Sequence, residues 1–493
     1  MTITPVNSAY NSFSQFDPKP IQATQTRSRI PTPTHEIKDV VKISSKNVDT
    51  NPKNLVLGSL IALGIGALAV ISNKKAVPVK NDTVTETVKT IASPYLEKLS
   101  KGLSDYTGKK ITADRLKSVM TREEFVTAIK NLKDKNYIPS KENIEKGIFR
   151  ADLHSHSNYS DGKGTVETIL DDVAKYADSM HAKTKEKFIF ALTDHDEING
   201  VKKSLEIIAN NPEKFKNVRF VTGIEASYTH PSINNDISWG TSEVLIHCID
   251  PFSENANKFC DDIKVQRKNM INGFMQDAKE INPDVNFSME EAIRTNFIRT
   301  PNLHGNQWSV FHYIETKRGV AKYAKEQGKN AEQLYEEIMK KLDPSQGRYL
   351  STLQDKGLIR KGFAEDKNIK SMCNNKYSPK FENGKMISQG AEHTLENIMD
   401  AFSKEKEVFI SFAHPVFIIE HARDKKGQPD INVLRGFLDG IVEKSKGLIQ
   451  GTEAYHQSYF SKYKTMAKEI NSFLETKNLI NLGGRDNHEP HFL

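Results

Sequence analysis

From residue 148 onward, short apolar segments alternate with longer amphipathic segments. The clearest apolar segments are 188–192, 218–221, 408–412, 448–451 and 479–482. Such a rhythm of strand, helix and strand is typical of βα units, whose strands form one buried and mostly parallel sheet. The pattern therefore predicts an α/β fold for residues 148–493.

The rest of the chain shows other patterns. Residues 1–54 are rich in Ser, Thr, Asn and Pro and have no apolar period, which predicts a disordered tail. Residues 74–147 show amphipathic helical patterns interrupted by Pro94, which predict a helical linker or stalk. Residues 253–404 are mostly helical and charged in pattern, so we expect a helical insertion within the α/β domain.

An uncharged apolar segment runs from Leu55 to Ile71, with lysines on both sides. As a helix it would be roughly 26 Å long, against a hydrocarbon core of about 30 Å. A secretory signal is less favoured because the polar segment before it is too long, and a buried core helix stays open as the alternative. The pattern favours a single transmembrane helix over residues 55–73 and a location in the membrane.

Two further expectations follow from this segment. Gly58, Ala62 and Gly66 fall on one helical face and would let a second helix approach, although small residues are also common in such spans. A dimer through this helix is therefore one reading. Lysines are nearly balanced across the segment, with one more on its C-terminal side, which slightly favours a cytoplasmic catalytic part.

Composition limits the partners. A formal charge of +7 from 70 basic and 63 acidic residues gives little support to a dedicated nucleic-acid protein, so nucleic acid stays open but is not favoured. The three cysteines, Cys248, Cys260 and Cys373, lack the paired spacing of a zinc ribbon or a disulfide framework.

Residues of the types that commonly bind metals lie at the ends of the predicted strands. They are His154, His156, Asp161, His195, Glu225, His247, His414, Asp486 and His488. Carboxyl ends of parallel strands meet at one mouth of a barrel, so ligands far apart in sequence converge there. Nine ligands are too many for one tetrahedral zinc but suit two or three divalent ions, with manganese, iron and zinc all open.

In this order, the segments ADLHSHSNYSDG, ALTDHDEINGV, FVTGIEAS, LIHCID, SFAHPV, GTEAYH and GGRDNH resemble the PHP (polymerase and histidinol phosphatase) family. The resemblance implies a distorted (β/α)7 TIM-like barrel with a trinuclear metal centre. It implies hydrolysis of a phosphorylated small molecule or nucleotide by metal-bound hydroxide.

The resemblance also distributes the ligands among three ions. One ion would lie among His154, His156, Glu225 and Asp486. Glu225 would bridge to a second ion held by His247 and His414. The third would be held by Asp161, His195 and His488.

Substrate contacts are predicted less directly. The resemblance places a catalytic histidine at His304, where the arginine of the family's Arg-x-His element is replaced by Asn302. Arg267, Arg299 or Arg485 could bind the anionic substrate in its place. Two alternatives remain, a nuclease of the same family type and a non-catalytic, membrane-anchored binding module.

Overall fold

The computed structural model describes much of the chain after residue 92. The described residues are 93–132, 139–231, 239–295, 297–298, 307–342, 349–358, 380–382, 385–388, 393–415, 430–454, 469, 472–473 and 475–492. The predicted tail, the predicted membrane helix at 55–73, Arg299 and His304 lie outside them. Within the described part, none of the helices is long and apolar enough to cross a membrane.

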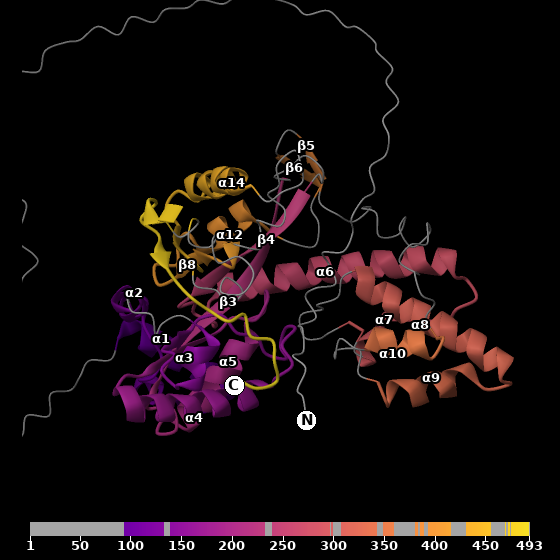
Figure 1. The fold of residues 1–493 in the computed structure, drawn as a ribbon, viewed down its shortest axis with the longest axis horizontal. Helices are drawn as coiled ribbons and strands as arrows, with labels where there is room; N and C mark the ends of the chain where they lie inside the picture. Colours follow the sequence, from indigo (N-terminus) through magenta and orange to yellow (C-terminus); the bar gives the residue numbers. More distant parts are fainter. Residues whose placement is uncertain are drawn as a thin grey trace, which may run out of the picture. The chain divides into compact units, whose positions relative to one another are not determined.

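One curled sheet forms the centre of the unit that begins at Thr90 (Figure 1). Its main strands follow the order β1 (Ala151–Asp152), β2 (Phe188–Leu192), β3 (Val218–Pro231), β4 (Trp239–His247), β8 (Phe409–Phe412), β9 (Ile449–Thr452) and β10 (Ile480–Asn481). Neighbours are parallel except at β4, which runs antiparallel to β3 and β8. The predicted α/β class is confirmed, and the reversed β4 was not foreseen.

Beyond their strands, the segments after β1 and β10 are linked by backbone hydrogen bonds. The amide of Leu153 donates to the carbonyl of Gly483 at 3.3 Å, and the amide of His156 donates to the carbonyl of Asn487 at 2.9 Å. These bonds bring the first and last strands of the sheet toward each other, so the sheet curls around an interior as in a half-barrel.

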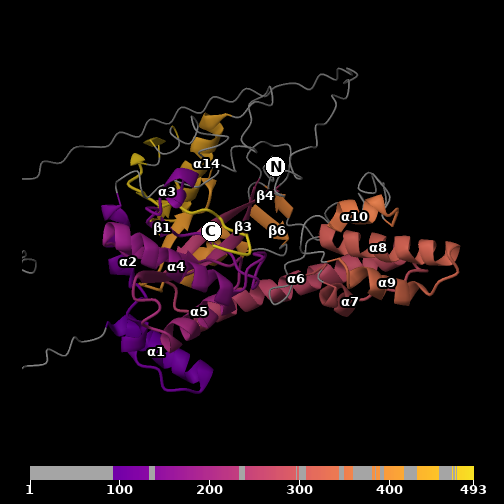
Figure 2. The same cartoon turned by 60° about the horizontal axis from the view of Figure 1, so that its bottom comes forward.

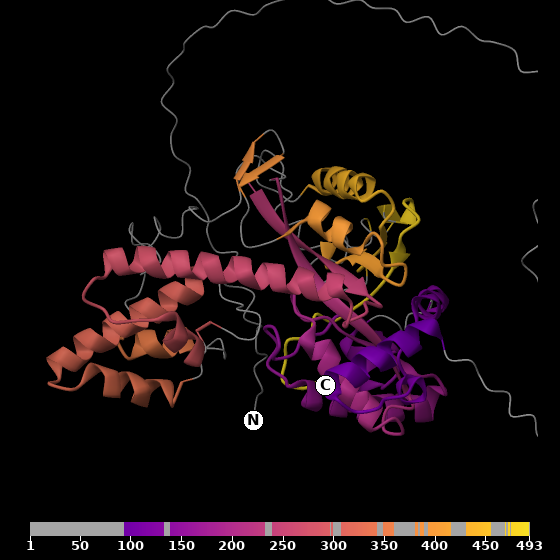
Figure 3. The same ribbon diagram turned by 180° about the vertical axis from the view of Figure 1, so that it is seen from behind.

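Helices cover the outer surface of this sheet. α1 (Pro94–Thr107), α4 (Val166–Thr184) and α5 (Asn199–Asn210) pack with Phe188, Phe190 and Phe220 of β2 and β3. The other half is covered by α12 (Leu395–Phe402), α14 (Ile431–Lys444) and the start of α6 (Glu254–Ile281), as Figure 3 also shows. Strands buried on both faces read as continuous apolar runs, which explains segments such as FIFAL.

The interior is filled at one end by α2 (Arg122–Asn131). Phe125 and Ile129 of this helix pack against the inward residues of the strands, among them Ile189 and Phe409. Thr121 and Glu124 form a capping box that starts the helix. Residues 93–132 therefore belong to the barrel unit, unlike the predicted linker or stalk at 74–147, because their apolar faces are buried against the sheet.

Three short elements complete the described parts near the barrel: η2 (Ala113–Leu116), α3 (Lys141–Glu145) and β7 (His393–Thr394). β7 pairs with the far end of β3. The positions of Val119 and Phe220 form a further parallel bridge, which ties the segment before α2 to β3.

The predicted helical insertion has a hydrophobic core of its own. Its core is formed by α6, α7 (Met289–Arg294), α8 (Gln307–Glu326), α9 (Ala331–Met339) and α10 (Tyr349–Asp355). The hairpin of β5 (Lys380–Glu382) and β6 (Lys385–Ser388) follows them in the sequence. Phe259 of α6 packs in the barrel core, whereas Phe274 of the same helix packs in the core of the insertion. Figure 2 shows α6 extending from the sheet to the helices of the insertion. One continuous helix thus joins the insertion to the barrel.

Candidate metal centre

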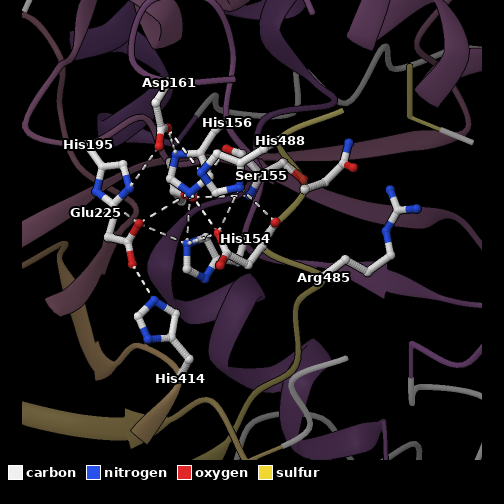
Figure 4. A network of polar contacts seen from close by, with 12 residues as sticks. His154, Ser155, His156, Asp161, His195, Glu225, His414, Arg485 and His488 are labelled. Carbon is white, nitrogen blue, oxygen red and sulfur yellow. Dashed lines mark hydrogen bonds and ion pairs between the residues drawn. The ribbon is translucent and has the colours of Figure 1, made fainter. Parts of the chain in front are cut away.

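Histidines and carboxylates converge where β1, β2, β8 and β10 end and where β3 extends past β2 (Figure 4). Eight of the nine predicted ligands take part: His154, His156, Asp161, His195, Glu225, His414, Asp486 and His488. Asp161 and Asp486 have exposed side-chain fractions of 18% and 11%, and Glu225 is fully buried, so the carboxylates among these eight residues are largely buried.

The first group surrounds the two histidines of the His-x-His element. Their Nε2 atoms lie 3.0 Å apart. Glu225 Oε2 lies 3.0 Å from His154 Nε2 and 3.2 Å from His156 Nε2, and Asp486 Oδ1 lies 3.1 Å from His156 Nε2. Ligand atoms of these four residues all lie within 4.8 Å of one another. Two imidazole nitrogens and two carboxylates directed at one point match the donor set of a divalent cation.

A second group combines His156 with Asp161, His195 and His488. Asp161 Oδ1 lies 3.0 Å from His488 Nε2, and Asp161 Oδ2 lies 3.9 Å from His195 Nε2. The ring of His156 stacks against those of His195 and His488, with centroid separations of 4.5 and 4.2 Å. The ligand atoms again lie within 4.8 Å of one another, so this group also fits a cation.

A third group includes a residue that the sequence analysis missed, Glu243 of β4. Its carboxylate lies 3.3 Å from His414 Nε2 and 3.9 Å from His195 Nδ1. His414 Nε2 is also 3.0 Å from Glu225 Oε1. Glu225 is therefore common to the first and third groups, since its two oxygens face different histidines.

The ninth predicted ligand, His247, does not join the centre. Its Nε2 donates to the carbonyl oxygen of Leu153 at 2.9 Å, and its ring lies 5.2 Å from that of Phe125 on α2. The reason is the reversed direction of β4, whose carboxyl end points toward the end of the interior that α2 fills. A strand-end rule that assumes parallel strands places this histidine at the wrong end.

Burial and opposite charges together set the protonation of the centre. Burial lowers the pKa of His156, but Asp486 and Glu225 outweigh it and raise that pKa to about 10. Burial by itself would raise the pKa of Glu225, but His154 and His195 hold that pKa well below its ordinary value. At Glu243, burial and then the charge of Glu225 raise the pKa to about 8. Without a cation, the histidines thus supply the positive charge that the carboxylates require.

Buried groups behind the centre orient its histidines. The Nδ1 of His154 donates to Glu453 Oε2 at 3.1 Å, and the backbone amide of His414 donates to the same oxygen at 2.8 Å. Carboxylates that accept from the far nitrogen of a histidine are common behind metal ligands, because they fix the tautomer and the ring. Glu453 follows β9, so the strand-end rule that selected the other ligands would also have selected it.

The turn that carries Asp161 is held by Asp194. This buried carboxylate accepts hydrogen bonds from the amide of Ser157 at 2.7 Å and from the hydroxyl of Ser160 at 2.7 Å. Burial raises the pKa of Asp194 above its ordinary value. A side chain at Gly200 would clash with this carboxylate, which explains the glycine there.

The two described arginines predicted to bind substrate are engaged elsewhere. Arg267 of α6 donates to Asp196 Oδ2 at 2.6 Å and is buried. Arg485 donates to Asp152 Oδ2 at 2.7 Å and lies over the ring of Phe492, with its guanidinium turned away from the cluster in Figure 4. Both side chains therefore pair with buried carboxylates.

No family model and no curated protein sequence matches the chain. Several solved structures are similar, including these two. A protein named as a metal-dependent phosphoesterase, from Bifidobacterium adolescentis, is 14% identical, with 69% of this chain and 87% of that chain covered and a TM-score of 0.36. An amidohydrolase from Chromobacterium violaceum, with bound sulfate and no metal, is 19% identical, with 69% and 88% covered and a TM-score of 0.35. Values this low assign neither a family nor a function.

Proposed function

We propose that this chain is a metal-dependent phosphoesterase of the PHP type, which hydrolyses a phosphorylated small molecule or nucleotide with two or three divalent ions. One observation carries the proposal. Imidazoles and carboxylates from separate strands converge in three adjoining groups, each with its ligand atoms within 4.8 Å. Purely structural histidines would not need several carboxylates at one buried point, because burying charge is costly unless a partner or ion balances it.

Each residue has a definite task in this proposal. Bound divalent ions would supply a water of lowered pKa and neutralise charge on phosphoryl oxygens. Glu225 links the first and third groups through its two oxygens. Glu453 holds His154 with its Nε2 toward the centre, and Asp194 holds the turn that brings in Asp161. The membrane location and the dimer predicted from residues 55–73 are proposals that rest on the sequence pattern alone.

The proposal is tested by metal analysis and hydrolysis together. Protein purified without chelator should contain more than one equivalent of transition metal and should hydrolyse an aryl phosphate. Asp486→Asn should lower metal content and reduce the rate by at least about 10–100-fold, because even partners behind a metal ligand have effects of that size. His491→Gln should change neither quantity, since that imidazole is 62% exposed and pairs with Asp172, outside the three groups of the centre.

Folded wild-type protein that holds no metal would contradict the proposal, as would full activity in the Asp486→Asn variant. A panel of phosphomonoesters, cyclic and linear dinucleotides and oligonucleotides then separates substrate classes. Faster hydrolysis of oligonucleotides than of monoesters would favour the nuclease alternative.

A further inference from the structure

Glu243 is an acidic side chain that reaches the centre from β4, the reversed strand of the main sheet as the structure describes it. We infer that Glu243, and not His247, is the ligand that β4 contributes, so that the ion beside His414 is held by carboxylates from two neighbouring strands, Glu225 and Glu243. The inference rests on the proposed function and deepens it, because it assigns a new ligand at the same site.

Strand register places the two carboxylates on one face. Glu225 of β3 pairs with Leu245 of β4, and Ser227 pairs with Glu243. Side chains two residues apart on a strand point the same way, so Glu225 and Glu243 are diagonal neighbours on the inner face. His247 pairs with Gly223 on the same face. All three side chains thus share the inner face. The direction of β4 decides whether Glu243 or His247 lies at the mouth where the ligands gather.

Distances to the histidines of the centre favour Glu243 over His247. One Glu243 oxygen lies 3.3 Å from His414 Nε2 and the other 3.9 Å from His195 Nδ1. Ligand atoms of His195, Glu225 and Glu243 lie within 4.8 Å of one another. These spacings are those of groups arranged around a common point, and both oxygens of Glu243 face imidazoles of the centre.

A second observation also indicates an absent cation. Glu225 is fully buried, and nitrogens of His154, His156 and His195 lie 3.0, 3.2 and 3.2 Å from its Oε2, yet this oxygen accepts no hydrogen bond of ordinary geometry among the described residues. Several imidazole nitrogens gathered at one buried carboxylate oxygen without hydrogen-bond geometry fit ligands around a cation, which would balance the carboxylate in place of protonated imidazoles. Glu243 is itself only 25% exposed, so a cation beside it would also favour the ionised form of its carboxylate.

The donor set has a consequence for the metal. His195, Glu225 and Glu243 form one group, and His414 lies beside both carboxylates. This donor set is richer in carboxylate than a three-histidine zinc site, and carboxylate ligands suit Mn²⁺. We therefore expect Mn²⁺ to occupy the position beside His414 and Glu243.

The test counts bound Mn²⁺ without measuring activity. Metal-free full-length protein is titrated with Mn²⁺, and free Mn²⁺ is followed by its electron paramagnetic resonance signal. Wild-type protein should bind two or three ions. Glu243→Gln should bind one ion fewer, or bind one ion at least 10-fold more weakly, whereas His247→Gln should bind the wild-type number. Thermal unfolding checks that each variant is folded.

Should Glu243→Gln fail to fold, Glu243→Asp answers the same question, because it keeps the charge but shortens the reach. It should bind the wild-type number of ions with one of them weakened. Unchanged number and affinity in Glu243→Gln, or in Glu243→Asp where Gln does not fold, would overturn the inference while leaving the proposed function intact. Loss of an ion in His247→Gln alone would also overturn it. Wild-type protein that binds no ion would instead defeat the proposed function.

Discussion

Two buried histidines show how surroundings assign roles to identical side chains. His154 Nε2 faces Glu225 and Asp486, and although burial lowers its pKa, these carboxylates and Glu453 raise it well above the ordinary value. His247 is equally buried but faces a backbone carbonyl, and burial lowers its pKa to about 4. The first imidazole lies in a field that attracts cations, and the second is a neutral structural group.

Arg485 is the residue whose predicted role changes most. Its side chain is 8% exposed and pairs with Asp152, which is fully buried and also accepts the Arg485 amide at 3.0 Å. Removal of one partner of a buried pair costs roughly 3–5 kcal/mol, because the other charge is left without compensation. Arg485→Ala should therefore lower the free energy of unfolding by about that amount, as measured by urea denaturation.

A double variant separates this structural role from substrate binding. Asp152→Asn combined with Arg485→Gln leaves no uncompensated charge, so it should be more stable than Arg485→Ala. The Michaelis constant for an aryl phosphate should stay near its wild-type value in the double variant. A raised Michaelis constant with unchanged stability would support the substrate role that the sequence suggested.

Among the elements, α2 fills one end of the barrel interior. Its Phe125 is fully buried and packs edge-on against Phe409, with ring centroids 5.4 Å apart. Arg122 at the start of the helix donates to Gln450 Oε1 at 2.8 Å and to the carbonyl of Val408 at 3.1 Å. Arg122 thus fixes the first turn of the helix to β9 and to the residue before β8. Beyond this turn, apolar side chains of the helix fill the barrel interior.

Truncation of this helix's main anchor should be costly. Phe125→Ala should destabilise the protein by about 3–5 kcal/mol, the range for phenylalanine in a closed core. Tyr106→Ala on α1 is the matched control, because that ring is 54% exposed and should change stability by less than about 0.5 kcal/mol. Thermal and urea unfolding of both variants measure the difference. Equal effects would mean that α2 is a peripheral linker after all.

For the whole molecule, the balance of charge in the centre links stability to pH. In metal-free protein, burial by itself would lower the pKa values of His414 and His156. Glu225 and other carboxylates outweigh burial and raise these pKa values to about 9 and about 10. A raised histidine pKa stabilises the fold below the unfolded value of about 6.5, and the contribution is lost as pH rises through the folded values. The lowered pKa of Glu225 stabilises the fold above the unfolded value of about 4.3, and this contribution is lost as pH falls through the folded value.

Metal-free protein should therefore be most stable between about pH 5 and 6.5 and should lose stability toward pH 9–10. Metal binding requires neutral imidazoles, so the stabilisation by added Mn²⁺ should grow over the same interval. Melting temperatures at pH 6, 7, 8 and 9, with Mn²⁺ or with chelator, measure both trends. A gap between the two curves that does not change with pH would contradict this account of the centre.

Sequence alone determined much of this protein. Apolar segments ending in His or Asp predicted the strands, the α/β class and eight residues of the centre, because strand ends in a parallel sheet gather at one edge regardless of their separation in the chain. The charged helical region between β4 and β8 was likewise visible in the pattern as an insertion.

Tertiary structure decided the rest. Periodicity reports that a strand has two faces, but not which way the strand runs, so only the structure could place Glu243 at the mouth and His247 at the opposite end. It also showed that the helices at 94–131 bury their apolar faces against the sheet, and that Arg485 is paired with Asp152. These outcomes depend on partners distant in the chain, which no local pattern contains.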